Sequence, residues 1–197
     1  MINKTATLFL LFIASTCFGQ KIKDLQVLNR FSVSEDGLFT EGYLAPIGQY
    51  IHTDNGKTYA WFAGGRLHQT QGNYKDRLLN GIYTESYTNK QLARKGTYKK
   101  GLQKGAWYSW RENGVLKVSD HYKKGKLNRY QISYDSLGMP AKRVHFRKGI
   151  RNGLEQDYQQ GKWKTIGKYK SGKSVPLKEP LPKRTINAIF KKHHKKD

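Results

Sequence analysis

Short stretches of alternating apolar and polar residues, separated by turn residues, follow one another through most of this chain. Around the turn Glu112-Asn113-Gly114, residues 107–110 are rich in aromatic side chains, and the stretch 116–122 has apolar residues at Leu116, Val118 and Tyr122. Alternation with a period of two is typical of a half-buried strand, and Asn-Gly between two such stretches is typical of a tight hairpin turn. The pattern therefore predicts strand, turn and strand, in an all-β fold.

An aromatic anchor residue recurs along the chain at a nearly constant interval. The anchors are Tyr74, Tyr98, Tyr122, Phe146 and Tyr169, whose numbers differ by 24, 24, 24 and 23. Glycine follows three positions later at Gly101, Gly125, Gly149 and Gly172, with Arg77 in the first case, and seven positions later at Gly81, Gly105 and Gly153, with Arg129 once in its place. A period of this size is typical of a repeat protein whose units are stable only when stacked on their neighbours.

Two short strands and two turns fill one unit, so the repeat predicts an elongated antiparallel meander of stacked β-hairpins. Counting back from Tyr74 adds a less regular unit at 50–73, and the array then covers 48–175. Eleven or twelve strands at roughly 4.8 Å each would give a sheet of about 55 Å. Helix is disfavoured because glycine costs roughly 1 kcal/mol at each helical position.

Two kinds of glycine have an expected structural role in this array. Glycine two residues before an anchor, as at Gly96 and Gly167, leaves room for a neighbouring ring to lie on the backbone. Gly105 is expected to need its small size at a turn, so that Gly105→Val would unfold the middle of the array.

The segments that flank the array differ from it. Residues 20–47 are less regular, and we expect them to form an N-terminal cap with strands on both sides of the turn Glu35-Asp36-Gly37. Residues 176–197 form a basic tail that contains proline, and apolar residues at helical spacing within 183–192 predict a short helix there. Docking of this helix on the last hairpin and binding to a membrane surface are both open.

Residues 1–19 have the features of a secretory signal peptide. Lys4 supplies a positive charge, an apolar run follows, and small residues near Gly19 permit cleavage before Gln20. The apolar run is too short to span a bilayer as a helix. Acylation of Cys17 as a lipoprotein is the alternative, but Thr16 fits that processing less well than simple cleavage. We therefore expect export to the periplasm, the outer envelope or the medium.

The chain has a formal net charge of +23, and its basic residues are placed regularly. One or two positions after the anchors come Lys75, Lys99, Lys100, Lys123, Lys124, Arg147, Lys148 and Lys170. Equivalent turns of a repeat lie on the same edge of a sheet, so these side chains are expected to form a basic ridge. Such a ridge is either a solvated edge that prevents aggregation or a contact line for a polyanion.

The segments Tyr98-Lys-Lys-Gly-Leu-Gln-Lys-Gly-Ala-Trp-Tyr-Ser-Trp-Arg-Glu-Asn-Gly-Val-Leu and Phe146-Arg-Lys-Gly-Ile-Arg-Asn-Gly-Leu-Glu-Gln-Asp-Tyr resemble the MORN-repeat variant proteins of bacteria. The resemblance covers about residues 50–175, and Arg77 and Arg129 depart from its pattern. These proteins are often catalogued as antitoxin-like modules. The resemblance implies a β-hairpin array with a non-enzymatic role in interactions, and it brings no catalytic residues to this chain.

Motifs for catalysis or metal binding are not recognised in the sequence. Its six histidines lack the spacing of a metal site, and it has no phosphate loop, nucleophile elbow or dinucleotide fingerprint. We therefore expect no enzyme, cofactor or metal. One hypothesis is a scaffold that binds anionic lipid or polysaccharide through the ridge, with peripheral membrane association; the other is a protein-binding module that acts as an antitoxin or immunity partner. Export argues against intracellular nucleic acid as the partner.

Overall fold

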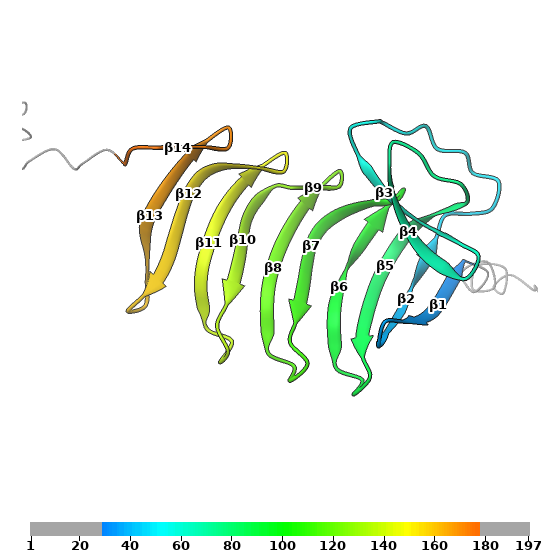
Figure 1. Cartoon of the computed structure of the whole chain (residues 1–197), viewed down its shortest axis with the longest axis horizontal. Coiled ribbons are helices and arrows are strands. Elements are labelled where there is room, and N and C mark those ends of the chain that lie inside the picture. Colours follow the sequence, from blue (N-terminus) through cyan, green and yellow to red (C-terminus); the bar gives the residue numbers. More distant parts are fainter. Residues whose placement is uncertain (1–28, 178–197) are drawn as a thin grey trace, which may run out of the picture.

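The computed structural model describes residues 29–177 and shows an all-β fold. Its 14 strands belong to one open antiparallel sheet, which Figure 1 shows as a long curved ribbon. In chain order the strands are β1 (Arg30–Glu35), β2 (Leu38–Leu44), β3 (Thr58–Ala63), β4 (Arg66–Gln71), β5 (Arg77–Tyr87), β6 (Leu92–Lys99), β7 (Leu102–Trp110), β8 (Leu116–Lys123), β9 (Lys126–Leu127), β10 (Arg129–Tyr134), β11 (Pro140–Arg147), β12 (Ile150–Gln159), β13 (Lys162–Lys170) and β14 (Lys173–Val175).

Strands that follow each other in sequence pair with each other over most of the sheet. The spatial order is β1-β2-β5-β6-β7-β8-β10-β11-β12-β13-β14, with β9 paired to β8 and with β3 and β4 outside this path. The predicted all-β antiparallel meander is confirmed in this form. The strands expected on both sides of Glu35-Asp36-Gly37 are β1 and β2, and both residues of their turn have positive φ, 52° at Asp36 and 74° at Gly37.

The hairpin β3–β4 leaves this path and forms a second layer. Only Trp61 and Phe62 of β3 pair with β5, whereas β2 pairs with β5 along most of the length of β2. The prediction that 50–73 forms the first unit of the meander is therefore wrong. Tyr59, Ala60 and Trp61 are buried in succession, so both faces of β3 are covered, and a strand with two apolar faces needs a place inside the protein.

One face of the sheet carries a row of aromatic side chains beneath this second layer. Tyr83, Tyr98, Trp107 and Tyr122 come from β5, β6, β7 and β8, and the centroids of successive rings are 5.3, 5.0 and 6.1 Å apart. Trp107 is only 1% exposed. It lies on Gly96, where an added Cβ would be 2.1 Å from its ring. The space predicted for a ring is thus confirmed at Gly96, whereas at Gly167 the nearest ring, that of Tyr169, would be 3.6 Å from an added Cβ and leaves room for it.

Four tight turns on one edge of the sheet share the same backbone conformation. The central residues of these turns are Lys100-Gly101, Lys124-Gly125, Lys148-Gly149 and Ser171-Gly172. The first residue of each pair has φ between 51° and 54°, and the glycine has φ between 74° and 85°. Two consecutive left-handed residues define the type I′ turn, whose twist matches that of the flanking strands. Each glycine N–H also donates to a carbonyl oxygen of the preceding hairpin, at Leu79, Gln103, Leu127 and Arg151 respectively.

The position seven residues after each of the first four anchors also has a left-handed backbone. The φ values are 134° at Gly81, 71° at Gly105, 87° at Arg129 and 132° at Gly153. Gly105 lies inside β7 beside a register irregularity, and a Cβ added there would meet nothing within 4 Å. The expectation that Gly105 needs small size at a turn is therefore wrong, because its backbone conformation, not the available space, favours glycine.

Replacing Arg129 by glycine is expected to stabilise the protein. A side chain held at φ 87° is strained by about 1–2 kcal/mol, and glycine relieves that strain at some cost in chain entropy. The expected net gain is about 0.5–1 kcal/mol, or roughly 2 °C in melting temperature. Arg129→Ala is the control, since it removes the guanidinium and keeps the strained Cβ, so it should give no gain. A melting temperature that does not rise for Arg129→Gly would contradict the explanation.

Candidate functional site

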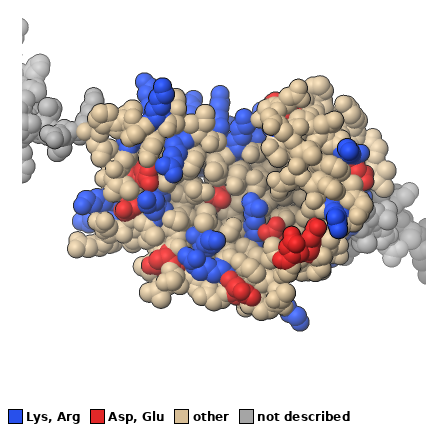
Figure 2. Space-filling model, viewed as in Figure 1, with Lys and Arg blue, Asp and Glu red and all other residues tan. Residues whose placement is uncertain are grey.

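Seven of the eight basic residues selected from the sequence lie at the four type I′ turns. They are Lys99, Lys100, Lys123, Lys124, Arg147, Lys148 and Lys170, and all are exposed. Figure 1 shows these turns along one edge of the sheet, and Figure 2 shows blue side chains gathered along the same upper edge. We call this set of side chains the basic ridge.

Lys75 does not lie at such a turn. It belongs to the connection between β4 and β5, where neither Asp76 nor Arg77 has a positive φ. The guanidinium of Arg77 donates to the carbonyl oxygen of Ala45 at 2.8 Å, and this contact holds the chain as it enters β5. The expectation that Lys75 joins the row of equivalent turns is therefore wrong, since Arg77 replaces the glycine that the turn requires.

The two long edges of the sheet differ strongly in charge. The connections given below each include one strand residue on either side. On the ridge edge, the connections 99–102, 123–126, 147–150 and 170–173 contain nine Lys or Arg residues and no acidic residue. On the opposite edge, the connections 87–92, 110–116, 134–140 and 159–162 contain three basic and two acidic residues. The positive charge of the turns is therefore concentrated on one edge.

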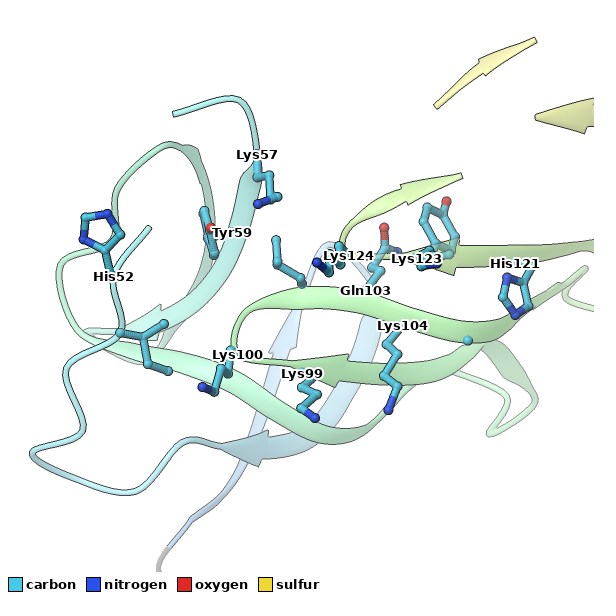
Figure 3. A pocket seen from close by; sticks show the side chains of 14 residues that line it. His52, Lys57, Tyr59, Lys99, Lys100, Gln103, Lys104, His121, Lys123 and Lys124 are labelled. Atoms are coloured by element: carbon cyan, nitrogen blue, oxygen red, sulfur yellow. The ribbon is translucent and has the colours of Figure 1, made fainter. Parts of the chain in front are cut away.

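A groove of about 630 Å³ opens where the ridge meets the second layer. Its lining residues come from the loop before β3, from β3, and from the two neighbouring turns with their strands: Ile51, His52, Lys57, Tyr59, Lys99, Lys100, Leu102, Gln103, Lys104, Gly105, His121, Tyr122, Lys123 and Lys124. In the view of Figure 3, His52 and His121 lie at opposite ends, with the lysines between them. The groove thus joins four ridge lysines to residues far away in sequence.

The lining of the groove is cationic. It contains six lysines, two histidines and no acidic residue. The ammonium group of Lys57 lies 2.5 Å from the Asp54 carboxylate, outside the lining, and this hydrogen bond lowers the pKa of Asp54. Among residues 29–177, none of the other five groove lysines forms an ion pair. An anion that enters the groove therefore meets five lysine ammonium groups that are not paired with a carboxylate of the described residues, besides Lys57 with its partner Asp54.

The floor of the groove is apolar and well fixed. Leu102 and Tyr122 are half-buried, while Ile51 and Tyr59 belong to the core and are 9% and 3% exposed. The hydroxyl of Tyr59 accepts a hydrogen bond from the Asp54 N–H at 3.0 Å, which fastens the loop to β3. The ammonium groups thus surround an aliphatic and aromatic surface.

Asp120 lies on β8, two residues from Tyr122, and its burial raises its pKa despite a hydrogen bond from Gln131. A carboxylate whose pKa is raised by folding destabilises the folded state as pH rises from the unfolded pKa through the folded one. We therefore expect Asp120→Asn to raise the melting temperature at pH 7. The gain should vanish near pH 3, where the unfolded and the folded Asp120 are both largely protonated. An equal gain at both pH values would contradict the assigned cause.

Sequence reasoning found the ridge and missed the groove. Lys57 and Lys104 have no equivalent in the anchor pattern, and no signal in the sequence places residues 51–59 beside residues 99–105. Within 29–177, no group of three or more His, Cys, Asp or Glu residues could hold a metal ion, and no helix is long and apolar enough to cross a membrane.

The predictions for residues 1–19 and for the helix within 183–192 lie outside the described residues. The ridge and the groove both lie within the described residues. Searches against protein-family models and against curated proteins found no match to this chain.

Proposed function

We propose that this protein is a non-enzymatic scaffold that binds an anionic lipid surface or an anionic polysaccharide along its basic ridge. The observation that carries the proposal is the difference between the edges, with nine cations and no acidic residue on one and mixed charges on the other. A sheet holds its turns at fixed spacing, so the cations act together on a ligand that presents negative charges in a row. A solvated edge that only prevents aggregation would not require such a contrast between the edges.

The proposal includes a repeat unit that has the period of the anchors. Such a unit occurs in the MORN-like proteins that the sequence resembles. Two sets of contacts support it. In all four turns the glycine N–H donates to the residue five positions after the preceding anchor: Leu79, Gln103, Leu127 and Arg151. His121 and His145 each directly precede an anchor, and each has Nδ1 next to the carbonyl oxygen seven positions later, at Asn128 and Asn152. Regular recurrence of such contacts is what stacked units predict.

Export through the N-terminal segment 1–19 is the second part of the proposal. Its support is the sequence pattern of a charged residue, an apolar run and small residues. A ligand outside the inner membrane follows from export, and lipid headgroups and polysaccharides are the abundant polyanions there. Peripheral association with a membrane through the ridge is the arrangement that fits a lipid ligand.

Neutralising four ridge residues is expected to weaken binding strongly. The variant carries Lys99→Gln, Lys100→Gln, Lys123→Gln and Lys124→Gln. Each lysine near an anionic surface contributes about 1 kcal/mol, so the affinity should fall at least 10-fold and the dependence of affinity on salt should become weaker. The measurements are cosedimentation with vesicles that contain phosphatidylglycerol and calorimetry with an anionic polysaccharide. The two assays distinguish the two sources of negative charge.

A matched control removes the same charge elsewhere. Lys90, Lys95, Lys117 and Lys162 are exposed and lie away from the four type I′ turns. Their replacement by Gln lowers the net charge equally and should reduce binding much less. Equal losses in both variants would show that total charge decides binding and would reject the ridge. Unchanged binding in the first variant, with its melting temperature retained, would favour the protein-binding module instead.

A further inference from the structure

The groove differs from the rest of the ridge in one respect. Beyond Lys124, the ridge turns are exposed on a single layer of sheet, whereas the turns at Lys100 and Lys124 face the second layer across the groove. A polymer or a bilayer surface needs only the charges. The apolar floor formed with Leu102 and Tyr122 must therefore serve either folding alone or a ligand that has an apolar part.

Hydrogen bonds hold the walls of the groove in place. The Ile51 N–H donates to the Tyr74 hydroxyl at 2.8 Å, and the Thr53 hydroxyl donates to the Gly72 carbonyl oxygen at 2.5 Å. On the other side, the Ala60 N–H donates to the Gly101 carbonyl oxygen at 2.8 Å and joins β3 to the turn of the ridge. The backbone bond from Ala60 to Gly101 thus joins the second layer to the ridge, and the two bonds through side-chain hydroxyls hold the loop at Ile51 and Thr53 in place. Walls held in this way are usual for a ligand site that needs little rearrangement.

The chemistry of the walls selects the ligand. Lysine presents an ammonium group on a flexible apolar stem, so the six lysines of the lining offer a ligand both apolar surface and positive charge. A volume of about 630 Å³ lies in the range of about 300–1,000 Å³ typical of small-molecule sites. A ligand that satisfies both features has a strongly anionic head and a hydrocarbon part, and one molecule fills the groove.

We propose that this groove binds a single phosphate-bearing amphiphile, with its phosphate among the lysines and its hydrocarbon chain on the floor. The proposal deepens the proposed function and rests on it, since Lys99, Lys100, Lys123 and Lys124 belong to both sites. It differs from ridge binding in stoichiometry, in dependence on chain length and in the lysines involved. Lys57 and Lys104 belong to the groove alone, and Arg147, Lys148 and Lys170 belong to the ridge alone.

The test is calorimetry on the full chain with alkyl phosphates below their micelle concentrations. Hexyl, octyl and dodecyl phosphate should bind with one molecule per protein, and each added CH₂ that enters the groove should improve the dissociation constant about 2- to 4-fold. Inorganic phosphate and a non-ionic dodecyl maltoside should each bind at least 10-fold more weakly than dodecyl phosphate. No dependence on chain length, or several molecules per protein, would overturn the proposal.

Two variants separate this proposal from the proposed function. Lys57→Gln with Lys104→Gln should weaken dodecyl phosphate binding at least 5-fold and leave vesicle and polysaccharide binding within 2-fold. Arg147→Gln, Lys148→Gln and Lys170→Gln should do the reverse. If the ridge variant weakens dodecyl phosphate as much as the groove variant, the groove proposal is wrong while the ridge stands. If only dodecyl phosphate binds and vesicles and polysaccharide do not, the ridge proposal is wrong while the groove stands. Melting temperatures identify any variant that loses its fold.

Discussion

Gly96→Ala is expected to destabilise the protein by about 3 kcal/mol or more, because the added methyl group has no room. It would lie 2.1 Å from a ring carbon of Trp107, a side chain that is 1% exposed. That ring is held between Tyr98 and Tyr122, with centroids 5.0 and 6.1 Å away, so it cannot move without moving the row. Overpacking of a core costs typically about 1–3 kcal/mol and occasionally more.

The expected result for Gly96→Ala is a melting temperature lower by roughly 6–12 °C, and chemical denaturation would give the free energy of unfolding. The direction of this change in stability is informative, since alanine in place of a strand glycine normally stabilises a protein by lowering the entropy of the unfolded chain. Gly167 provides the control because it also lies two residues before an anchor and has an ordinary backbone conformation. A Cβ there would be 3.6 Å from its nearest neighbour, so Gly167→Ala should change stability by less than about 0.5 kcal/mol. Equal effects at the two sites would contradict the role assigned to the ring.

The contrast between these two glycines shows what the repeat pattern can and cannot predict. The pattern predicts glycine at both positions and a ring above each. At Gly167 the nearest ring atom, on Tyr169, would be 3.6 Å from an added Cβ, whereas at Gly96 a ring would overlap the added Cβ. Trp107 supplies that ring, whereas the residue across from Gly167 is Glu155, which forms ion pairs with Lys142 and Arg151 on the open part of the sheet. Spacing along the chain thus predicts which backbone positions are equivalent, and the side chains of the neighbouring strands decide how each is used.

The positions of tight turns could be predicted because they depend on residues that are adjacent in the sequence. Asp36-Gly37 and Lys100-Gly101 are left-handed pairs between short apolar stretches, a signal carried by adjacent residues. The position of β3–β4 could not be predicted, because it depends on contacts between residues that are distant in sequence. One example is the contact of Phe31 and Phe62, whose ring centroids are 4.8 Å apart. The burial of β3 also departs from the alternation of the other strands, because Tyr59, Ala60 and Trp61 are all buried.

The groove forms only because the second layer is present. Since the position of the second layer could not be predicted from the sequence, the groove could not be predicted either. Tyr59 and Leu102, two residues of the groove floor, are far apart in sequence, and they meet because β3 docks over the turn at Gly101. At that turn an added Cβ would be 2.6 Å from Leu78 and 3.2 Å from Tyr59. The residues that hold the second layer are therefore expected to decide both the stability of the N-terminal part of the sheet and the shape of the groove.

Leu78→Ala is expected to have the second large effect, a loss of about 2–5 kcal/mol. Leu78 is 1% exposed and packs in one cluster with Ala45, Ile51, Tyr59 and Trp61. Its removal leaves a cavity between the sheet and the second layer that the backbone hydrogen bond from the Ala45 N–H to the Leu78 carbonyl oxygen prevents from closing. Thermal and chemical denaturation measure the loss.

Ile150 is the matched control for Leu78, because each lies four residues after its anchor. Ile150 lies on the part of the sheet without a second layer and is 51% exposed, so Ile150→Ala should cost less than about 0.5–1 kcal/mol. If position in the repeat decided stability, the two substitutions would cost the same. If the second layer decides it, as we expect, only Leu78→Ala lowers the melting temperature strongly, and it should also weaken dodecyl phosphate binding, because Ile51 and Tyr59 line the groove.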